Sequence, residues 1–542
     1  MTVQEDARSR SATRGDGPPE RESHARGWRG LGWGFLVKLL LMALVNAIGL
    51  SVILGAVRSE SWFILGAAIV LLVATDVIYF TKRALPLKYM APGLIFLLVF
   101  QIFSLVYTGY VAFTNYGSGH SGSQAQAVQA ALIQAEQRVP DSPSYPLSVV
   151  SRGDELGFAI ADSDGDVRVG TELEPLSVQP DAEVGGAGAP TEVPGWTVIP
   201  RAEVLTDTEL QQRVTALRVP VSDDPEEGSI RTRDGTSGAV YLSSLDWDPD
   251  TETLTETATG KVYSASDRGS FVAEDGSSLP AGWSVPVGFE NFVRAFTDTN
   301  YAAPLLQVTV WTFAFAILTT LSSFGLGLLL AIIYNDSRVR GRKLIRTLFI
   351  LPYAFPVFMS ALLWRGMLNP EFGIVNDLLF FGADLNWFQD PTLARFAVLW
   401  VNLWLSFPYW FLVCTGALQA LPADTLEAAE IDGAGRFRRF RSIMLPLLLV
   451  STAPLAIASF AFSFNNFTLI YLLTGGGPNF AGSTSQLGAT DLLINAVYQI
   501  SGVSGGSSDY GLASALSIII FIVIGAISAV AFRQTRKLEE MQ

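Results

Sequence analysis

The sequence predicts an α-helical polytopic membrane protein with eight transmembrane helices and a β-rich extracytoplasmic insert domain. Three observations predict this fold class. The 542 residues are 49% hydrophobic and 16% charged, with a mean hydropathy of +0.35, whereas a soluble domain carries about 25% charged residues. Apolar runs long enough to cross a bilayer recur along the chain. One assignment of inside and outside agrees with the placement of the basic residues.

The first segment, residues 1–31, is polar and mixes several arginines with acidic residues. This composition predicts a disordered cytoplasmic tail. A membrane helix needs about 20 mostly apolar residues, and the predicted helices lie at 33–56, 61–80, 89–113, 304–334, 347–366, 395–419, 446–473 and 511–532. Pro352 and Pro356 interrupt the fifth of these runs, and Pro408 removes a backbone donor from the sixth.

The links between these runs differ in charge. If the N-terminus lies inside, the cytoplasmic links are 81–88, 335–346 and 420–445. These links and the C-terminus are basic. The external links are mostly acidic or neutral, and they are 57–60, 115–287, 367–394 and 474–510. This is the pattern that the positive-inside rule requires. The sequence therefore predicts a multi-pass protein with both termini in the cytoplasm.

The predicted domains are a tail, three helices, an insert and a helical core, at 1–31, 32–114, 115–287 and 288–542. More than half of the acidic residues lie in the insert, which has no apolar run long enough to span a membrane. A helix is predicted at 123–137. Short alternating runs separated by Asp-Gly and Thr-Gly turns then predict strands, at 157–160, 167–169, 240–242 and 261–263.

The acidic patch at Asp162-Ser163-Asp164-Gly165-Asp166 resembles a calcium-binding loop in composition. An EF-hand loop needs glycine at its sixth position and glutamate at its twelfth, where this chain has Val167 and Leu173. A hairpin turn is the preferred interpretation. The two histidines lie in polar segments and the single cysteine, Cys414, lies in an apolar run, so no metal site and no disulfide are predicted.

The remaining residues do not favour an enzyme or a nucleic-acid-binding protein. Gly260-Lys261 is followed by valine, so it does not complete a phosphate-binding loop. With almost no histidine, no Ser/His/Asp set and no catalytic residues are predicted. The net charge of −14 leaves no basic face once the cytoplasmic loops are assigned. We therefore expect neither catalysis nor a cofactor bound by this chain, and any energy for uphill transport must come from a partner.

Residues 427–446 form a polar, basic segment between two apolar runs. Asp424 and Glu427 have the spacing of a helix-capping pair, and Gly433 permits a sharp turn. A second short helix is predicted at 436–444, and Pro446 suits the first turn of the following membrane helix. We interpret the segment as a cytoplasmic helix–turn–helix that another protein can grip, and the alternative is an ordinary basic loop.

Polar residues in two membrane helices form candidate ligand clusters. The sixth run contains Asn402, Ser406 and Tyr409 at helical spacing, and the seventh contains Ser459, Ser463 and Asn466 with Phe462 between them. Hydrogen bonding between helices would also account for such residues. The mixture of amides, hydroxyls and aromatic rings favours a sugar, because the clusters contain no charged side chain for a charged substrate.

Two motifs carry a resemblance to a known family. The first resembles the EAA motif of importer-type ABC permeases. It consists of Glu427-Ala428-Ala429, then Gly433 after three residues, then Ile443, Leu445 and Pro446 after nine more. The run from Phe464 to Pro478 and the segments Val287–Phe292 and Thr490–Leu493 are similar to the MalF branch of the maltose/maltodextrin permeases. The resemblance covers most of the chain from about residue 86 onward.

The resemblance implies a type I ABC importer permease fold and a MalF-type subunit in the bacterial cytoplasmic (inner) membrane. Its implied partners are a MalG-like second permease, a MalK-like ATPase dimer that binds ATP-Mg, an extracytoplasmic maltose-binding protein or lipoprotein, and membrane lipid. The EAA residues Glu427, Ala428, Ala429, Gly433, Ile443, Leu445 and Pro446 would couple to the ATPase. The implied sugar-binding positions are Asn402, Leu405, Ser406, Tyr409, Ser459, Phe462, Ser463 and Asn466.

Several alternatives remain open at this point. Ser406 stands where the family pattern has glycine, and Ser463 where it has asparagine, so trehalose or another oligosaccharide is an alternative substrate. A glycerol phosphate importer would need a cationic cavity. A membrane-anchored sensor receptor would need neither an EAA motif nor buried amides in its helices.

Overall fold

The computed structural model describes residues 33–539 except 60, 82–84, 163, 187, 225–226, 337, 483–484, 504 and 506. The predicted tail at 1–31 and the basic residues Lys82 and Arg83 lie outside the described residues. The chain divides into two compact units between Leu105 and Val106.

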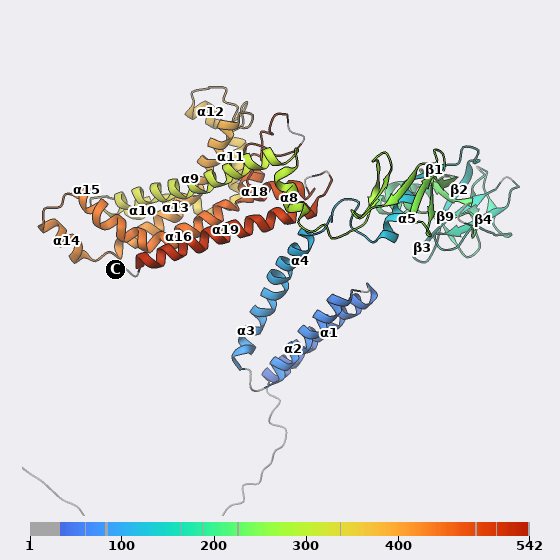
Figure 1. Ribbon diagram of the computed structural model, residues 1–542, viewed down its shortest axis with the longest axis horizontal. Coiled ribbons are helices and arrows are strands. Elements are labelled where there is room, and N and C mark those ends of the chain that lie inside the picture. Colours follow the sequence, from blue (N-terminus) through green and yellow to red (C-terminus); the bar gives the residue numbers. More distant parts are fainter. Residues whose placement is uncertain are drawn as a thin grey trace, which may run out of the picture. The chain divides into compact units, whose positions relative to one another are not determined.

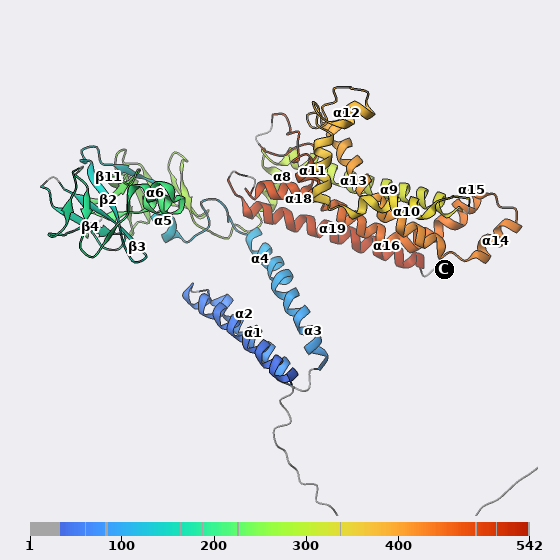
Figure 2. The same cartoon turned by 180° about the vertical axis from the view of Figure 1, so that it is seen from behind.

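The first unit contains a pair of helices, α1 (Trp33–Arg58) and α2 (Trp62–Phe80), which run side by side (Figures 1 and 2). Lys38 Nζ donates a hydrogen bond to the carbonyl oxygen of Tyr79 at 2.7 Å, and Asn46 Nδ2 donates to Asp76 Oδ1 at 2.9 Å. These bonds satisfy polar side chains inside apolar helices. The chain continues through α3 (Leu85–Phe96) and the π-helical η1 (Leu97–Ile102) into α4 (Phe103–Ala112).

The second unit contains the helical core. Its long helices lie alongside one another in both views (Figures 1 and 2), and they are α9 (Ala302–Asn335), α13 (Pro391–Gln419), α16 (Leu445–Phe464) and α19 (Tyr510–Glu539). The shorter elements are α8 (Glu290–Thr297), α10 (Arg342–Ile350), η3 (Leu351–Ala354), α11 (Val357–Met367), α12 (Ile374–Leu379), α14 (Ala423–Ile431), α15 (Arg436–Arg439), η4 (Phe440–Met444), α17 (Phe467–Leu473) and α18 (Leu493–Ile500). The elements α14 and α15 lie at the end of the long helices where α19 ends, and α8 and α18 lie at the other end.

The described residues confirm a polytopic helical protein. Helices long and apolar enough to cross a membrane are Trp33–Arg58, Leu85–Ala112, Ala302–Asn335, Pro391–Gln419, Arg436–Phe464 and Tyr510–Thr535. The second predicted run appears as a shorter apolar helix, Ile64–Phe80. The fifth predicted run forms two helical halves with a sharp bend between them. If these halves count as one span, the described residues contain seven possible crossings. The number of eight therefore stays a prediction.

Two of the predicted helices are interrupted. The fifth, 347–366, consists of Arg342–Ala354 and Val357–Met367, bent by 94°, because prolines at 352 and 356 cannot supply the backbone donors of a continuous helix. The seventh, 446–473, ends at Phe464, and α17 starts only at Phe467. Asn465 Nδ2 donates to the carbonyl oxygen of Ala461 at 3.4 Å, and this side-chain bond replaces a backbone bond where the helix stops.

Helices α9 and α13 approach each other closely at Gly327 of α9. A Cβ there would lie 2.6 Å from Trp410 Cβ and 2.7 Å from the Phe411 backbone nitrogen of α13. We expect Gly327→Ala to force these helices apart and to cost about 1–3 kcal/mol. The matched control is Gly325→Ala, whose Cβ would have no neighbour within 4 Å. Thermal unfolding of the purified chain should show a lower midpoint for Gly327→Ala alone, and equal midpoints would contradict the close packing.

The insert is β-rich, as predicted. One sheet has the order β5-β4-β3-β2-β11-β10-β9, with β1 on β11 and β8 on β2, and a second is the meander β12 to β16. Their bounds are β1 (Glu136–Arg138), β2 (Tyr145–Arg152), β3 (Glu155–Ala161), β4 (Val167–Thr171), β5 (Ser177–Val178), β8 (Thr197–Val198), β9 (Val219–Pro220), β10 (Ser229–Thr232), β11 (Ser237–Ser243), β12 (Leu245–Asp248), β13 (Thr253–Glu256), β14 (Val262–Ala265), β15 (Ser270–Ala273) and β16 (Ser278–Gly282). A small ribbon pairs β6 (Glu183–Val184) with β7 (Pro190–Glu192).

Each sheet has its own apolar core. The first is covered by α6 (Arg201–Thr206) and α7 (Thr208–Ala216), with Phe158 and Ile230 fully buried or nearly so. The second packs against α5 (Gln124–Gln134), where Val128 meets Leu254 and Phe271. The predicted helix at 123–137 is thus confirmed, although it is shorter. Asp162 lies in the turn between β3 and β4, where its Oδ1 accepts from the backbone N–H of Asp166 at 2.9 Å, as the hairpin interpretation requires.

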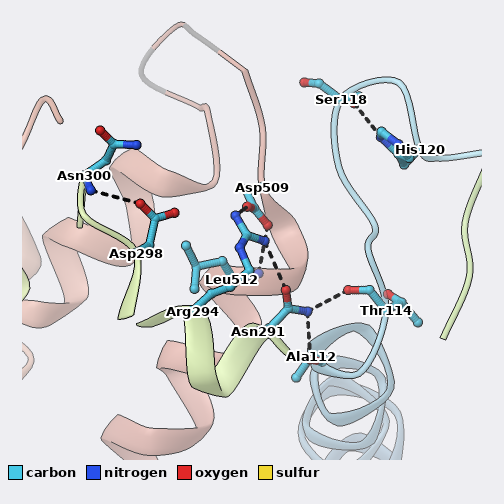
Figure 3. Close-up of polar contacts among 10 residues, drawn as sticks. All are labelled: Ala112, Thr114, Ser118, His120, Asn291, Arg294, Asp298, Asn300, Asp509 and Leu512. Atoms are coloured by element: carbon cyan, nitrogen blue, oxygen red, sulfur yellow. Dashed lines mark hydrogen bonds and ion pairs between the residues drawn. The ribbon is translucent and has the colours of Figure 1, made fainter. Parts of the chain in front are cut away.

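A polar junction ties the base of the insert to the helical core (Figure 3). The amide of Asn291, 1% exposed, donates to the carbonyl oxygens of Ala112 at 3.0 Å and Thr114 at 2.7 Å. Arg294 donates to Asn291 Oδ1 at 3.3 Å and to Asp509 Oδ2 at 2.9 Å. These bonds connect the end of α4, the helix α8 and the start of α19. The insert therefore joins the core at the end of the long helices opposite α14.

Candidate functional site

Residues 420–446, called here the EAA segment, form a helical hairpin. Glu427, Ala428 and Ala429 lie on α14, which is followed by Gly433 with a φ of 76°. Glycine is favoured in this left-handed conformation because it has no Cβ. The backbone N–H of Ala434 donates to the carbonyl oxygen of Ala429 at 2.9 Å and closes the turn. The predicted sharp turn at Gly433 is confirmed.

The predicted capping role of Asp424 is wrong. The N-cap of α14 is Pro422, and no side chain caps the helix there. Asp424 lies inside the first turn instead, one residue beyond the first helical position. An acidic side chain in the first turn still stabilises the helix through its interaction with the helix dipole.

The second half of the EAA segment is continuous with a core helix. It runs from α15 through the π-helical η4 directly into α16, with Pro446 in the first turn. Phe440, Met444 and Leu445 pack onto the buried cluster formed by Trp410, Phe411, Cys414, Leu418 and Leu448. Ile443 is half-buried and Pro446 is exposed. Because of this packing, a displacement of the hairpin would move the ends of α13 and α16.

The tip of the hairpin exposes apolar side chains. Ile431 is 86% exposed and Phe437 is 73% exposed, while Glu427 and Ala428 beside them are also exposed. Arg439 forms an ion pair with Glu430 at 2.5 Å, which joins the two halves of the hairpin. Exposed apolar side chains gathered at a protruding tip are typical of a surface that a partner covers. Sequence reasoning missed Ile431 and Phe437, although apolar residues in a basic loop were a visible signal.

The membrane helices bring two of the predicted sugar-binding residues together. Asn466 Nδ2 donates a hydrogen bond to Asn402 Oδ1 at 3.0 Å, across 64 residues of sequence. Asn402 is 4% exposed on α13, and Asn466 is the N-cap of α17. A single bond uses one of the two Nδ2 protons of Asn466, so the pair retains hydrogen-bonding capacity for a ligand.

The other predicted positions differ in their surroundings. Leu405 packs against the buried cluster that contains Val401 and Leu469, and Tyr409 contacts the ring of Trp410 at 5.5 Å between centroids. Ser463 is buried, Ser406 and Ser459 are half-buried, and Phe462 is 74% exposed. Among the described residues, the Asn402–Asn466 hydrogen bond therefore links the two predicted clusters. The sugar-binding role of all eight residues stays a prediction.

Sequence reasoning missed a buried carboxyl in the loop before α18. Asp491 is fully buried, and it accepts hydrogen bonds from the Gly488 backbone N–H at 2.8 Å and from Gln499 Nε2 at 3.1 Å. Burial raises the pKa of Asp491 from 3.8 to about 7, and these hydrogen bonds only partly oppose the change. The available signal was the lone acid in the Thr490–Leu493 stretch.

The buried carboxyl predicts a pH-dependent stability. A carboxyl whose pKa is raised by folding binds its proton more tightly when folded, so stability falls as the pH rises from about 4 to about 7. Asp491→Asn should remove this loss. We expect the free energy of unfolding of the variant, relative to that of the wild type, to increase by about 2–3 kcal/mol between pH 5 and pH 8. Unfolding midpoints of both proteins at three pH values test this. An advantage that does not change with pH would contradict it.

Comparisons with known proteins identify the family to which this chain is similar. The family described as "Binding-protein-dependent transport system inner membrane component" matches residues 323–538, and "N-terminal of TM subunit in PBP-dependent ABC transporters" matches residues 95–173. The maltose/maltodextrin transport system permease protein MalF of Vibrio vulnificus is 35% identical, covering 92% of this chain and 95% of that protein. MalF of Escherichia coli K12 is 36% identical, covering 85% and 88%.

A solved chain from a bacterial ABC transporter involved in the import of the acidic polysaccharide alginate is 25% identical to this chain. The match covers 46% of this chain and 84% of that chain, with a TM-score of 0.40.

Proposed function

Since this chain belongs to the MalF family of ABC transporter permeases, we propose that it forms the sugar pathway of an importer for maltose and maltodextrins. Members of this family are non-catalytic subunits in the inner membrane. The observation that supports this most is the EAA segment. Its tip exposes apolar side chains, and its second half continues through η4 into α16, the helix that precedes Asn466. Residues of η4 also pack onto the helical core. Such an arrangement can transmit a partner's movement to the candidate sugar-binding residues.

The partners are a MalG-like second permease, a MalK-like ATPase dimer that binds ATP-Mg, and an extracytoplasmic binding protein. The ATPase engages Glu427, Gly433 and the apolar side chains at the tip. The end of the bundle that carries α14 faces the cytoplasm, so both termini are cytoplasmic. The insert lies outside and contacts the binding protein, and its limits are residues 115–287.

The sugar is held between α13 and α16–α17. Asn402 and Asn466 supply amides, Ser406, Tyr409, Ser459 and Ser463 supply hydroxyls, and Leu405 and Phe462 supply apolar contacts. Phe462, 74% exposed in this chain, would face the second permease across the sugar. A carbohydrate offers hydroxyls and apolar C–H faces, which suits this set of side chains.

The test is transport by the assembled complex in proteoliposomes. Maltose and maltotriose should each stimulate ATP hydrolysis and enter the vesicles. Glycerol phosphate should do neither. Stimulation by trehalose alone would show that the substrate is another oligosaccharide, in agreement with serine at positions 406 and 463. If the ATPase is active but no sugar stimulates ATP hydrolysis or enters the vesicles, the proposal is overturned.

A further inference from the structure

A polar cavity lies beside α17 and α18, apart from the candidate residues in the membrane helices. Its volume is about 330 Å³, and its lining includes Tyr471, Gln486, Asp491, Asn495, Tyr498 and Gln499. Since one water occupies about 30 Å³ of liquid, the cavity has room for much more than an isolated structural water. It is also within the range of volumes that small-molecule sites have.

The lining of the cavity contains buried hydrogen-bond acceptors that lack partners. Asn495 is 3% exposed, and its Oδ1 has no hydrogen-bond partner among the described residues. The same holds for Gln499 Oε1, whose Nε2 already donates to Asp491. A buried acceptor without a donor is unfavourable. A ligand that brings several O–H groups would satisfy these atoms.

The lining also contains two aromatic residues, Tyr471 and Tyr498. The ring of Tyr471 stacks on Phe467 at 5.2 Å between centroids, and Tyr498 meets Tyr471 edge-on at 5.4 Å. Asn495 Nδ2 donates to the carbonyl oxygen of Phe467 at 3.4 Å, so the amide and the rings belong to one packed unit. Aromatic rings and hydroxyl-accepting groups in one lining suit a pyranose ring, which has apolar C–H faces and O–H edges.

The lining argues against the two other simple ligand classes. It contains no lysine or arginine, which disfavours an anionic ligand. Asp491 is its one carboxylate, and the described residues contain no group of three or more histidine, cysteine or acidic side chains placed to hold a metal ion. Calcium in proteins takes 6–8 oxygen ligands, commonly including several carboxylates. A neutral polyol therefore fits the cavity better than a divalent cation.

Helix α17 separates the cavity from the Asn402–Asn466 pair. Leu469, Ile470 and Leu473 of α17 belong to the buried cluster that contains Val401 of α13, whereas Tyr471 meets Tyr498 of α18 at the cavity. We propose that the cavity is a separate carbohydrate subsite on the α18 side of α17, which binds one ring of a neutral oligosaccharide. This inference rests on the proposed function, because it assumes that the chain carries a sugar.

A thiol placed at the rim tests the subsite directly. Gln486 is exposed, whereas the native Cys414 is buried, so Gln486→Cys supplies an accessible thiol in the assembled complex. We expect maltotriose to slow its modification by a small thiol-specific reagent about fivefold or more. The binding protein is left out, because its docking could shield the thiol. The control is Phe296→Cys on α8, a 71% exposed position outside the cavity lining, whose modification should not change.

A second pair of variants tests the aromatic part of the lining. Tyr498→Ala, made together with Gln486→Cys, should abolish the protection by maltotriose, and Tyr498→Phe should retain most of it because the ring is kept. Transport of the same sugar by the wild-type complex separates the two proposals. Normal transport without protection of the thiol introduced by Gln486→Cys would overturn the subsite alone. Protection by calcium chloride alone, with no effect of maltotriose, would also overturn it.

Discussion

Replacing Glu427 with lysine is expected to abolish sugar-stimulated ATP hydrolysis and uptake while the chain stays in the membrane. Glu427 is exposed on α14 and forms no ion pair within the described residues, so its loss should not destabilise this chain. A reversed charge at a partner interface costs several kcal/mol, which corresponds to a reduction of more than about 100-fold in the coupled activity. Membrane content, ATPase co-purification and uptake are measured on the same preparation.

The matched control is the same charge reversal at Glu371, which is exposed in the link before α12. This variant should transport at the wild-type rate. If Glu427→Lys also transports normally, the EAA segment does not dock through this residue. Loss of the chain from the membrane would instead show a structural role for Glu427, which its exposure contradicts.

Hydropathy predicted the long helices because a membrane helix has to satisfy its own backbone and present apolar side chains. Composition contains less information about where such a helix bends or stops. Pro352 and Pro356 indicated an interruption, but the 94° angle depends on how the two halves pack. At the stop after Phe464, the side chain of Asn465 donates a hydrogen bond to the carbonyl oxygen of Ala461. An apolar run that continues on both sides conceals this bond.

The insert shows the same limit for strands. Alternating residues and Asp-Gly turns identified β3, β4, β11 and β14. The sheet order was not accessible, because Tyr145 pairs with Gly238 across a long sequence separation. Such pairings depend on which apolar faces share a core, here Leu147 with Ile230, and no local pattern states this.

The candidate site was predictable in part. The helical spacing of Ser459 and Ser463 holds on α16, but Asn466 lies beyond the end of that helix, so the argument from one continuous helical face was wrong for it. The chain break nevertheless directs its amide to Asn402. Three other residues of interest could be recognised only from how exposed or buried their side chains are. The exposure of Ile431 and Phe437 and the enclosure of Asp491 follow from tertiary packing.

Replacing Asn402 or Asn466 with alanine is expected to raise the KM for sugar about tenfold each, if each amide contributes a hydrogen bond of about 1–1.5 kcal/mol to the sugar. The competing explanation is that the two amides only bond to each other at 3.0 Å. A single substitution then leaves a buried polar group unpaired, and the chain loses stability.

The double variant Asn402→Ala/Asn466→Ala distinguishes these explanations. Removing both partners leaves no amide of the pair unsatisfied, so stability should recover relative to the two single variants. If the amides bind sugar, transport should stay low although stability recovers, and the KM should rise by about 100-fold when the effects add. Thr468→Ala, which removes an exposed hydroxyl on α17 two residues beyond the pair, is the control and should transport normally. A stable double variant with a wild-type KM would mean that the pair only connects two helices, because a sugar-binding pair cannot be removed without loss of affinity.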